Sequence, residues 1–287
     1  MKGVITISEN ILKTTIPDKV QYFIKIPKEV ILAKDIPEHR LSTYLYFYFN
    51  KTKDDMVHYC PIYMIQWCKY KPNWHRGTKE NIYTKFRDNM QWFFENGYLI
   101  NFEKEKYIQT TFQSSLLNTE KMNPSRNYGS LYDFEIEAIN NYQSLYKPLN
   151  KSILFLLLSY IKAFTWNRTN EISGHSEKSK KDKPEIFYSQ FTTIASFIGI
   201  NRKMIAKATE VLEQLGLIKT YRMPRYKDSS GNWHTDDIIY ICPYKFETHK
   251  KEILRCSKEV YNPEKELEYG IMYLREQKYV SKKFYQD

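Results

Sequence analysis

The stretch from Phe191 to Cys242 constrains the fold more than any other part of this chain, because each of its elements has a clear boundary. Asn201 is a natural N-cap for a helix, and Gly216 is a natural residue for ending one. Between and around these two signals, apolar spacing and β-rich runs define the remaining elements. The sequence predicts a helix over Thr192–Ile198, a turn at Gly199–Ile200, a helix over Asn201–Leu215, and a hairpin of strands Leu217–Arg222 and Ile238–Cys242.

The second of these helices has two different faces. One apolar stripe for packing inward consists of Ile205, Ala208, Leu212 and Leu215. Arg202 and Lys203 stand in the first helical turn, where a cation opposes the helix dipole at a cost of about 0.3–1 kcal/mol each. Helix stability does not explain them, whereas a polyanion in front of the helix would.

The order helix, turn, helix, hairpin is that of a winged helix-turn-helix, which places its second helix in the major groove of DNA and its hairpin on the backbone. The window from Gly199 to Asp228 is rich in Lys and Arg and poor in acidic residues. A solvated face is the alternative interpretation of such cations. The residues of this module expected to contact DNA are Arg202, Lys203, Ala206, Lys207, Arg222, Arg225, Lys227 and His234.

Composition agrees with a nucleic-acid partner. The net charge is +11 and the pI is near 9.2, which suits counterion release from DNA, although charge alone also permits other anionic partners. The hydrophobic fraction of 42% is ample for ordinary cores, and 287 residues favour two domains.

Targeting and cofactor signals are missing from the sequence. The longest apolar run, Ile153–Leu158, is far shorter than the roughly 20 residues that cross a bilayer, so no membrane association is expected. The 4 cysteines form no C-x-x-C pair and support neither a disulfide framework nor a zinc site. We therefore expect a reduced, cytoplasmic protein with no metal and no cofactor.

The same succession of elements is expected nearer the N-terminus. Aligning Gly97 with Gly216 superposes Phe86 on Ile205 and Phe93 on Leu212, so the architecture repeats although the sequence does not. The expected elements are helices over Glu38–Asn50, Pro61–Cys68 and Thr78–Asn96, a strand over Met56–Cys60, and a hairpin of Tyr98–Phe102 with Tyr107–Thr111.

The role of this first module stays open at the level of sequence. Glu103 and Glu105 at the hairpin tip would repel phosphate, so the module either contacts DNA through its helix or mediates dimerisation. The residues that would contact DNA are Arg76, Thr78, Lys79, Asn81, Tyr83 and Lys85.

The fold class expected for the whole chain is mostly α with small β-hairpins (α+β), with two winged helix-turn-helix domains in tandem. A strand is expected at Val20–Ile26, a buried helix at Leu149–Phe164, and a polar lysine-rich insert at Trp166–Pro184. The C-terminal segment, Phe246–Gln286, is expected to form two helices broken at Asn262–Pro263. Its alternating charge is typical of a solvated or partner-binding tail. The expected divisions are an arm at 1–35, a first winged helix at 36–113, a connector at 114–147, a second winged helix at 148–246 and a helical tail at 247–287.

Enzymatic signatures are absent, and we expect no catalytic residues. The 6 histidines never form the His-apolar-His cluster of a rolling-circle initiator, and there is no G-x-x-x-x-G-K-[ST] phosphate loop.

The Thr-x-Ile-Ala-x-x-x-Gly opening at Thr192 and the Leu-x-x-Leu-Gly-Leu-Ile exit at Leu212 resemble the winged-helix domains of bacterial regulators. The tandem arrangement resembles replication initiators of plasmids and phages. That resemblance implies binding to repeated double-stranded origin sites, duplex opening, and recruitment of the host helicase loader. Separately, we expect the C-terminal tail to contact host replication proteins or a second subunit of a homodimer. A transcriptional regulator and a conjugation or partition accessory protein are the alternatives.

Overall fold

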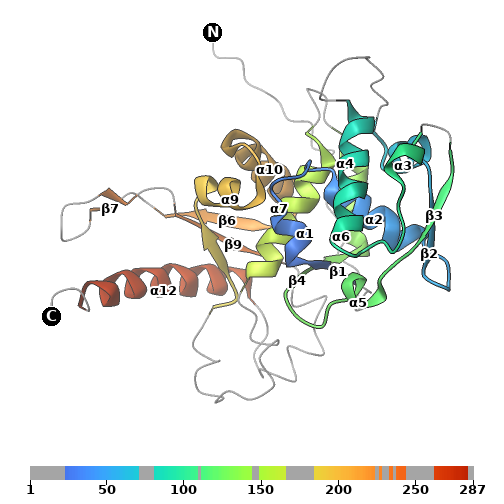
Figure 1. Cartoon of the computed structure of the whole chain (residues 1–287). Helices are drawn as coiled ribbons and strands as arrows, with labels where there is room; N and C mark the ends of the chain where they lie inside the picture. Colours follow the sequence, from blue (N-terminus) through green and yellow to red (C-terminus); the bar gives the residue numbers. More distant parts are fainter. Residues whose placement is uncertain are drawn as a thin grey trace, which may run out of the picture.

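The structure, a computed structural model, describes residues 23–70, 81–108, 111–143, 149–165, 184–223, 226–227, 233–234, 237–243 and 262–283. The fold mixes α and β, is mostly helical, and contains small antiparallel sheets, as the sequence predicted (Figure 1). In chain order the elements are β1 (Phe23–Pro27), α1 (Lys28–Leu32), α2 (Arg40–Asn50), β2 (Met56–Tyr59), α3 (Pro61–Trp67), α4 (Ile82–Glu95), the 3₁₀ turn η1 (Lys104–Lys106), β3 (Gln113–Leu116), α5 (Thr119–Met122), β4 (Tyr128–Tyr132), α6 (Asp133–Asn141), α7 (Lys151–Phe164), β5 (Phe187–Ser189), α9 (Phe191–Ile198), α10 (Arg202–Gln214), β6 (Lys219–Arg222), β7 (Tyr226–Lys227), β8 (Trp233–His234), β9 (Ile238–Ile241) and α12 (Pro263–Lys283).

Two successions of elements follow the same order and the same strand pairing. In the C-terminal half, α7, β5, α9, α10, β6 and β9 build a sheet in which β9 lies between β5 and β6. In the N-terminal half, α2, β2, α3 and α4 precede β3, which pairs with β2 on one side. A bridge between Leu99 and Leu117 brings the segment after α4 to the other side of that strand. The repeated order therefore extends to the hydrogen-bonded strands. Strand β5 was not expected from the sequence.

The long helices α4 and α10 begin and end in the same way. The side-chain carbonyl oxygens of Asn81 and Asn201 accept backbone hydrogen bonds from the second helical residue, Tyr83 and Lys203 respectively. The prediction for Asn201 is confirmed. The helix predicted over Thr78–Asn96 does not start at Thr78. The backbone of its N-cap residue, Asn81, is extended, and α4 begins only after it, at Ile82.

Glycine ends both helices. Gly97 and Gly216 have φ values of 68° and 70°, a left-handed conformation that glycine adopts without a side-chain clash. The apolar stripes align as predicted: Phe86 and Ile205 are fully buried, and so are Phe93 and Leu212.

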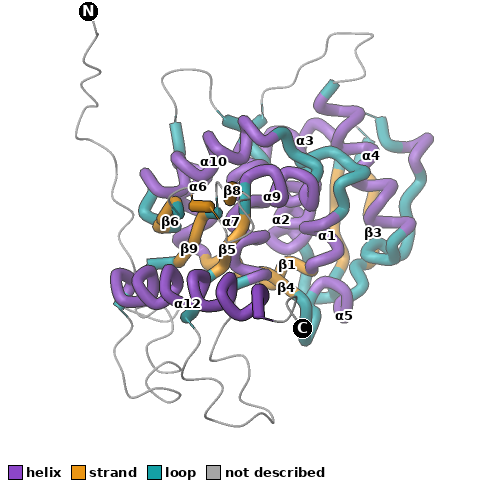
Figure 2. Tube along the Cα trace, turned by 90° about the vertical axis from the view of Figure 1, so that its left-hand side faces the viewer, coloured by secondary structure: helices purple, strands orange, loops and turns teal. Residues whose placement is uncertain are grey.

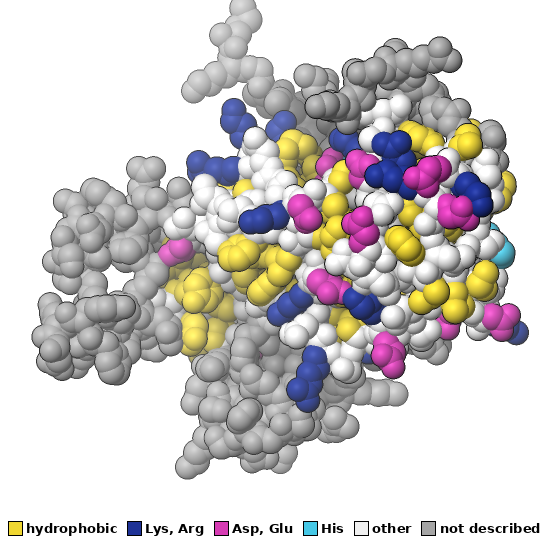
Figure 3. Space-filling model, viewed as in Figure 1, with side chains coloured by type: hydrophobic (Ala, Val, Ile, Leu, Met, Phe, Trp, Pro, Cys, Tyr) yellow, Lys and Arg dark blue, Asp and Glu magenta, His cyan; other side chains and the backbone are white. Residues whose placement is uncertain are grey.

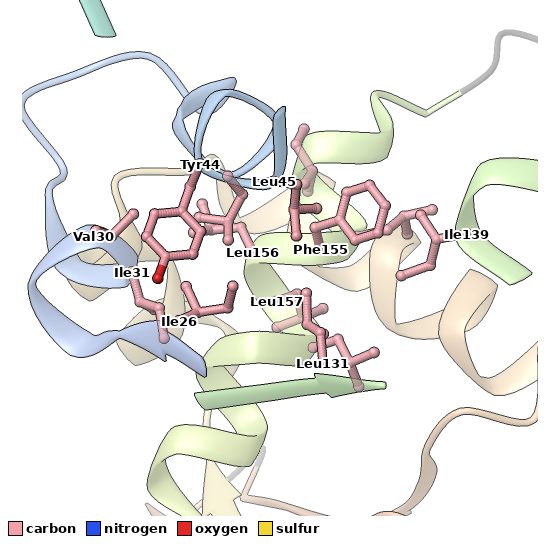
Figure 4. Packing of buried hydrophobic residues seen from close by; sticks show 14 of the residues in the cluster. Ile26, Val30, Ile31, Tyr44, Leu45, Leu131, Ile139, Phe155, Leu156 and Leu157 are labelled. Carbon is pink, nitrogen blue, oxygen red and sulfur yellow. The ribbon is translucent and has the colours of Figure 1, made fainter. Parts of the chain in front are cut away.

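A continuous hydrophobic core joins the two halves. Helix α7 runs through the middle of the molecule and is buried from Ser152 to Ile161, because its apolar residues face both halves (Figure 1). Figure 4 shows Phe155, Leu156 and Leu157 of α7 packed among Tyr44, Leu45 and other side chains of the N-terminal half. The same cluster continues to Ile205, Leu212 and Tyr240.

The predicted hairpin of Tyr98–Phe102 with Tyr107–Thr111 is wrong. Ile100 N–H donates to Leu116 O at 2.9 Å, so this segment pairs with a strand that starts later in the chain. Phe102 and Tyr107, on either side of η1, are both buried. Because burial of two aromatic side chains is strongly favourable, the chain turns inward at η1 and does not continue as an extended strand.

The segments expected to link and follow the modules contain regular structure. The segment 114–147, predicted as a connector, contains α5, β4 and α6, and β4 pairs with β1 so that Ile24 opposes Leu131. Figure 2 shows α12 alongside β9. Leu267 and Leu274 of α12 pack with Ile239 and Ile241 in a second apolar cluster. Gly270 permits this approach, since a Cβ there would lie 2.9 Å from Ile186. The helix predicted after Asn262 is present, but it covers a sheet face and is not a solvated tail. The preceding part of the tail and residues 166–183 of the lysine-rich insert predicted at Trp166–Pro184 lie outside the described residues.

Candidate functional site

The structure places α9 and α10 next to each other, joined by a tight turn, with their apolar residues in the core that also contains residues of α7 and β9. Ile194 and Ile198 of α9 are buried, as are Ile205, Ala208 and Leu212 of α10. Gly199 closes the turn with φ of 71°, and its N–H donates to Ala195 O at 3.0 Å. The outward surface of α10 is therefore fixed by packing on its opposite face.

This outward surface is basic. Arg202, Lys203 and Lys207 are exposed, and Ala206 between them is half-buried. Among the described residues, neither Lys203 nor Lys207 forms an ion pair. Figure 3 shows dark-blue side chains gathered on the upper left of the described surface, in the region where Figure 1 places α10. The helix predicted to read DNA thus presents cations, together with the partial positive charge of its own N-terminus.

The hairpin residues of the prediction are only partly described. Arg222, at the end of β6, is exposed, and its guanidinium lies 5.3 Å from the ring centroid of Phe191 at the start of α9. In the short ladder of β7 with β8, Lys227 is opposite Trp233 and His234 is opposite Tyr226. Arg225 lies outside the described residues. The structure therefore places Arg222 near α9, and beyond β6 and β9 the hairpin contains a second pair of strands, β7 and β8.

The corresponding residues of the first module are engaged within the protein. Asn81 caps α4, and the Tyr83 hydroxyl donates to Tyr107 O. Lys85 Nζ lies 3.8 Å from Glu38 Oε1. On this side Figure 3 shows dark-blue and magenta side chains intermixed. Arg76, Thr78 and Lys79 lie outside the described residues.

Sequence reasoning missed three polar residues on the outer side of α9. Thr192, Thr193 and Ser196 are exposed, and they belong to α9, which contacts α10. The apolar spacing of Phe191, Ile194 and Ile198 carries this information, because it leaves the intervening positions facing outward. Short hydroxyl side chains are suited to hydrogen bonds with phosphate oxygens.

A buried polar cluster stabilises the other module near the start of α4. Asn150, the N-cap of α7, donates to Glu38 Oε1 at 3.1 Å and lies 3.2 Å from His39 Nε2. Burial lowers the pKa of His39 to about 4, with Glu38 opposing this shift and Lys85 adding to it. His39 is therefore neutral at physiological pH and acts as a packing and hydrogen-bonding group.

The described residues contain no group of three or more His, Cys, Asp and Glu side chains that could hold a metal ion. In that same part of the chain, none of the helices is long and apolar enough to cross a membrane. Comparison with protein-family models, with characterised proteins and with solved structures gave no match to this chain.

Proposed function

We propose that this chain is a sequence-specific double-stranded DNA-binding protein with two winged-helix domains in tandem. The observation that carries the proposal is the basic outer face of α10, held on a helix, turn, helix and three-stranded sheet in the order that winged helices use. Lys203 and Lys207 have no competing carboxylate among the described residues. A phosphate backbone would supply the missing counter-charge.

Within this proposal, the residues of α10 contact bases in the major groove; they are Arg202, Lys203, Ala206 and Lys207. The residues of the hairpin contact the DNA backbone; they are Arg222, Arg225, Lys227 and His234. In the N-terminal half, Arg76, Thr78 and Lys79 would supply the first module's contacts, ahead of α4. Two contacting modules in one chain favour a replication initiator that binds repeated origin sites, as in plasmids and phages, over a regulator at a promoter.

A selection from a random duplex library tests the DNA-binding proposal. We expect an enriched motif of two half-sites, and about six phosphate contacts would give a log–log salt slope near −5. The matched variants are Arg202→Ala, which should relax the motif, and Arg222→Ala, which should weaken all sequences alike and flatten the slope by about one. Absence of any enriched motif would exclude sequence-specific binding.

The initiator role has a genetic test. The gene with its flanking DNA is placed in a replicon that lacks an origin, and maintenance is scored with Arg202→Ala as the negative control. Maintenance that depends on Arg202 supports an initiator. Failure of maintenance together with binding next to promoters in cells supports a regulator.

The proposed contact of the tail with host replication proteins or a second subunit needs point substitutions. Removing residues 247–287 would expose Ile239 and Ile241, which α12 covers. Tyr269 and Met272 are exposed on α12 and can be changed to Ala without uncovering that cluster. Loss of maintenance with normal DNA binding in these variants would identify α12 as the contact.

A further inference from the structure

Arg40, the first residue of α2, is a buried cation whose side-chain hydrogen-bond partners among the described residues are all backbone carbonyl groups. The residue as a whole is 1% exposed. Nε donates to Val30 O at 2.9 Å, and Nη1 donates to Ile36 O at 3.2 Å. Nη2 donates to both Ile31 O at 3.0 Å and Ile198 O at 2.9 Å. A planar guanidinium can serve several acceptors at once, which a lysine ammonium cannot do with the same geometry.

Three of these acceptors lie at helix ends. Val30 and Ile31 are near the end of α1, and Ile198 is the last residue of α9. The last carbonyl groups of a helix lack partners inside the helix and carry partial negative charge, so a cation there is stabilised. Burial lowers the pKa of Arg40 to about 10, which leaves the side chain charged at neutral pH. One side chain therefore joins the N-terminal half to the turn that precedes α10.

The turn itself is packed against the same part of the N-terminal half. A Cβ added at Gly199 would lie 2.8 Å from both Cβ and O of Lys34. Ile198 and Ile200, on either side of this glycine, are buried in the shared core. The α9–α10 turn thus has no space to shift toward the residues between α1 and α2.

We propose that Arg40 is a positioning residue that holds α10 in one orientation relative to α4 and so sets the spacing of the DNA half-sites that the chain accepts. This inference rests on the proposed DNA-binding function. Each base pair inserted between two half-sites moves one site by about 3.4 Å along the duplex and rotates it by roughly 35°. A rigid joint cannot follow that movement, whereas a loose joint can.

The first experiment tests the joint without DNA, so its outcome does not depend on the proposed function. Spin labels are attached to Glu95→Cys on α4 and Ser196→Cys on α9 in the full chain, and the distance distribution between them is measured. Cys256, which lies outside the described residues, is changed to Ser, because the other native cysteines, Cys60, Cys68 and Cys242, are buried. We expect one narrow distribution for the parent and a broadened or shifted one for Arg40→Met and Arg40→Lys. An unchanged distribution in both variants would overturn the inference.

The matched control is Tyr44→Phe. The buried Tyr44 hydroxyl lies 2.8 Å from both Lys25 O and Met122 O and has one proton to donate to these two acceptors, so this variant loses hydrogen bonding within the N-terminal half only. The distance distribution of Tyr44→Phe should stay narrow. Broadening equal to that of Arg40→Met would show that Arg40 contributes only to general stability, and would overturn the inference. If Arg40→Met does not fold, Gly199→Ala disturbs the same joint from the α9 side and should broaden the distribution.

The second experiment measures affinity for selected duplexes with two base pairs inserted between the half-sites. The parent and Tyr44→Phe should lose about tenfold or more, whereas Arg40→Met and Arg40→Lys should lose less than about threefold. Equal losses in all four proteins would overturn the positioning role while leaving DNA binding intact. Absence of sequence-specific binding by the parent would instead refute the proposed function, and the spin-label result would still stand.

Discussion

Helices α4 and α10 occupy equivalent places in the two successions of elements, yet they present different surfaces. Where α10 carries Arg202, Lys203 and Lys207, the aligned residues of α4 are Tyr83, Thr84 and Asp88. These three cations of α10 are exposed, whereas the three aligned residues of α4 are half-buried. Equivalent placement therefore does not give the two helices equivalent outer surfaces.

The difference concerns the outer faces alone. Tyr98 N–H donates to Phe93 O at 2.8 Å, and Leu217 N–H donates to Leu212 O at 2.9 Å, so both helices end in the same motif. Both stripes reach one core through α7. The comparison teaches that the described outer face of α4 is engaged in contacts within the protein, while the cations of α10 face outward.

The largest expected effect tests whether the two helices share one core. Phe86→Ala and Ile205→Ala each remove a fully buried side chain, and should lower the free energy of unfolding by about 3–5 kcal/mol and about 2–5 kcal/mol respectively. Because the core is continuous, urea unfolding followed by fluorescence and by circular dichroism should show a single transition in both variants. Glu95→Ala on the exposed end of α4 is the control, and separate transitions would contradict a shared core.

The next effect tests the difference between the outer faces. The double variant Arg202→Ala with Lys203→Ala should weaken binding to a selected duplex by about 3 kcal/mol, roughly a hundredfold. The matched double variant on α4, Lys85→Ala with Arg87→Ala, should lose less than about threefold, because Lys85 lies near Glu38 and Arg87 Nε lies 3.9 Å from Asp88. Equal losses would show that α4 reads DNA as α10 does.

The next prediction, of intermediate size, concerns the pH dependence of stability that His39 causes on the α4 side of the core. His39 lies 5.8 Å from the ring of Phe86, and burial lowers its pKa from 6.5 to about 4. Between these two pKa values the unfolded chain binds a proton that the folded chain does not, so stability decreases as the pH falls. Chemical unfolding should show that His39 accounts for about 2 kcal/mol of the loss between about pH 7.5 and pH 5. His39→Gln should remove this part, and His58→Gln, at an exposed site on β2, should leave it in place.

The smallest effect concerns the two helix caps. Asn81→Ala and Asn201→Ala should each lower the free energy of unfolding by about 1 kcal/mol, since each leaves a backbone N–H without its partner. The Asp variants keep an acceptor and should lose less than about 0.5 kcal/mol. Binding measurements should show a further loss only for Asn201→Ala, whose cap orients Lys203; an equal loss for Asn81→Ala would again place α4 on the DNA.

Local signals predicted the helices more accurately than the strands. Asn201, Gly199 and Gly216 fix helix ends by hydrogen bonds and backbone geometry within a few residues, so these boundaries were readable. The partner of Leu99 was not readable, because Leu117 is distant in the chain and burial of Phe102 and Tyr107 decided the path between them. At the candidate site, the sequence identified Arg202 and Lys203 as outward residues, and the apolar spacing of α9 also contained Thr192 and Ser196.

The sequence by itself determined the caps, the apolar stripes of α4 and α10, the basic face of α10 and the overall positive charge, because each depends on neighbouring residues or on composition. Only the tertiary structure decided that the two halves share one core, that α12 covers the sheet and that Arg40 joins α1 to α9. Those features depend on long-range burial and on carbonyl groups that every residue possesses, and a backbone acceptor leaves no mark in the sequence.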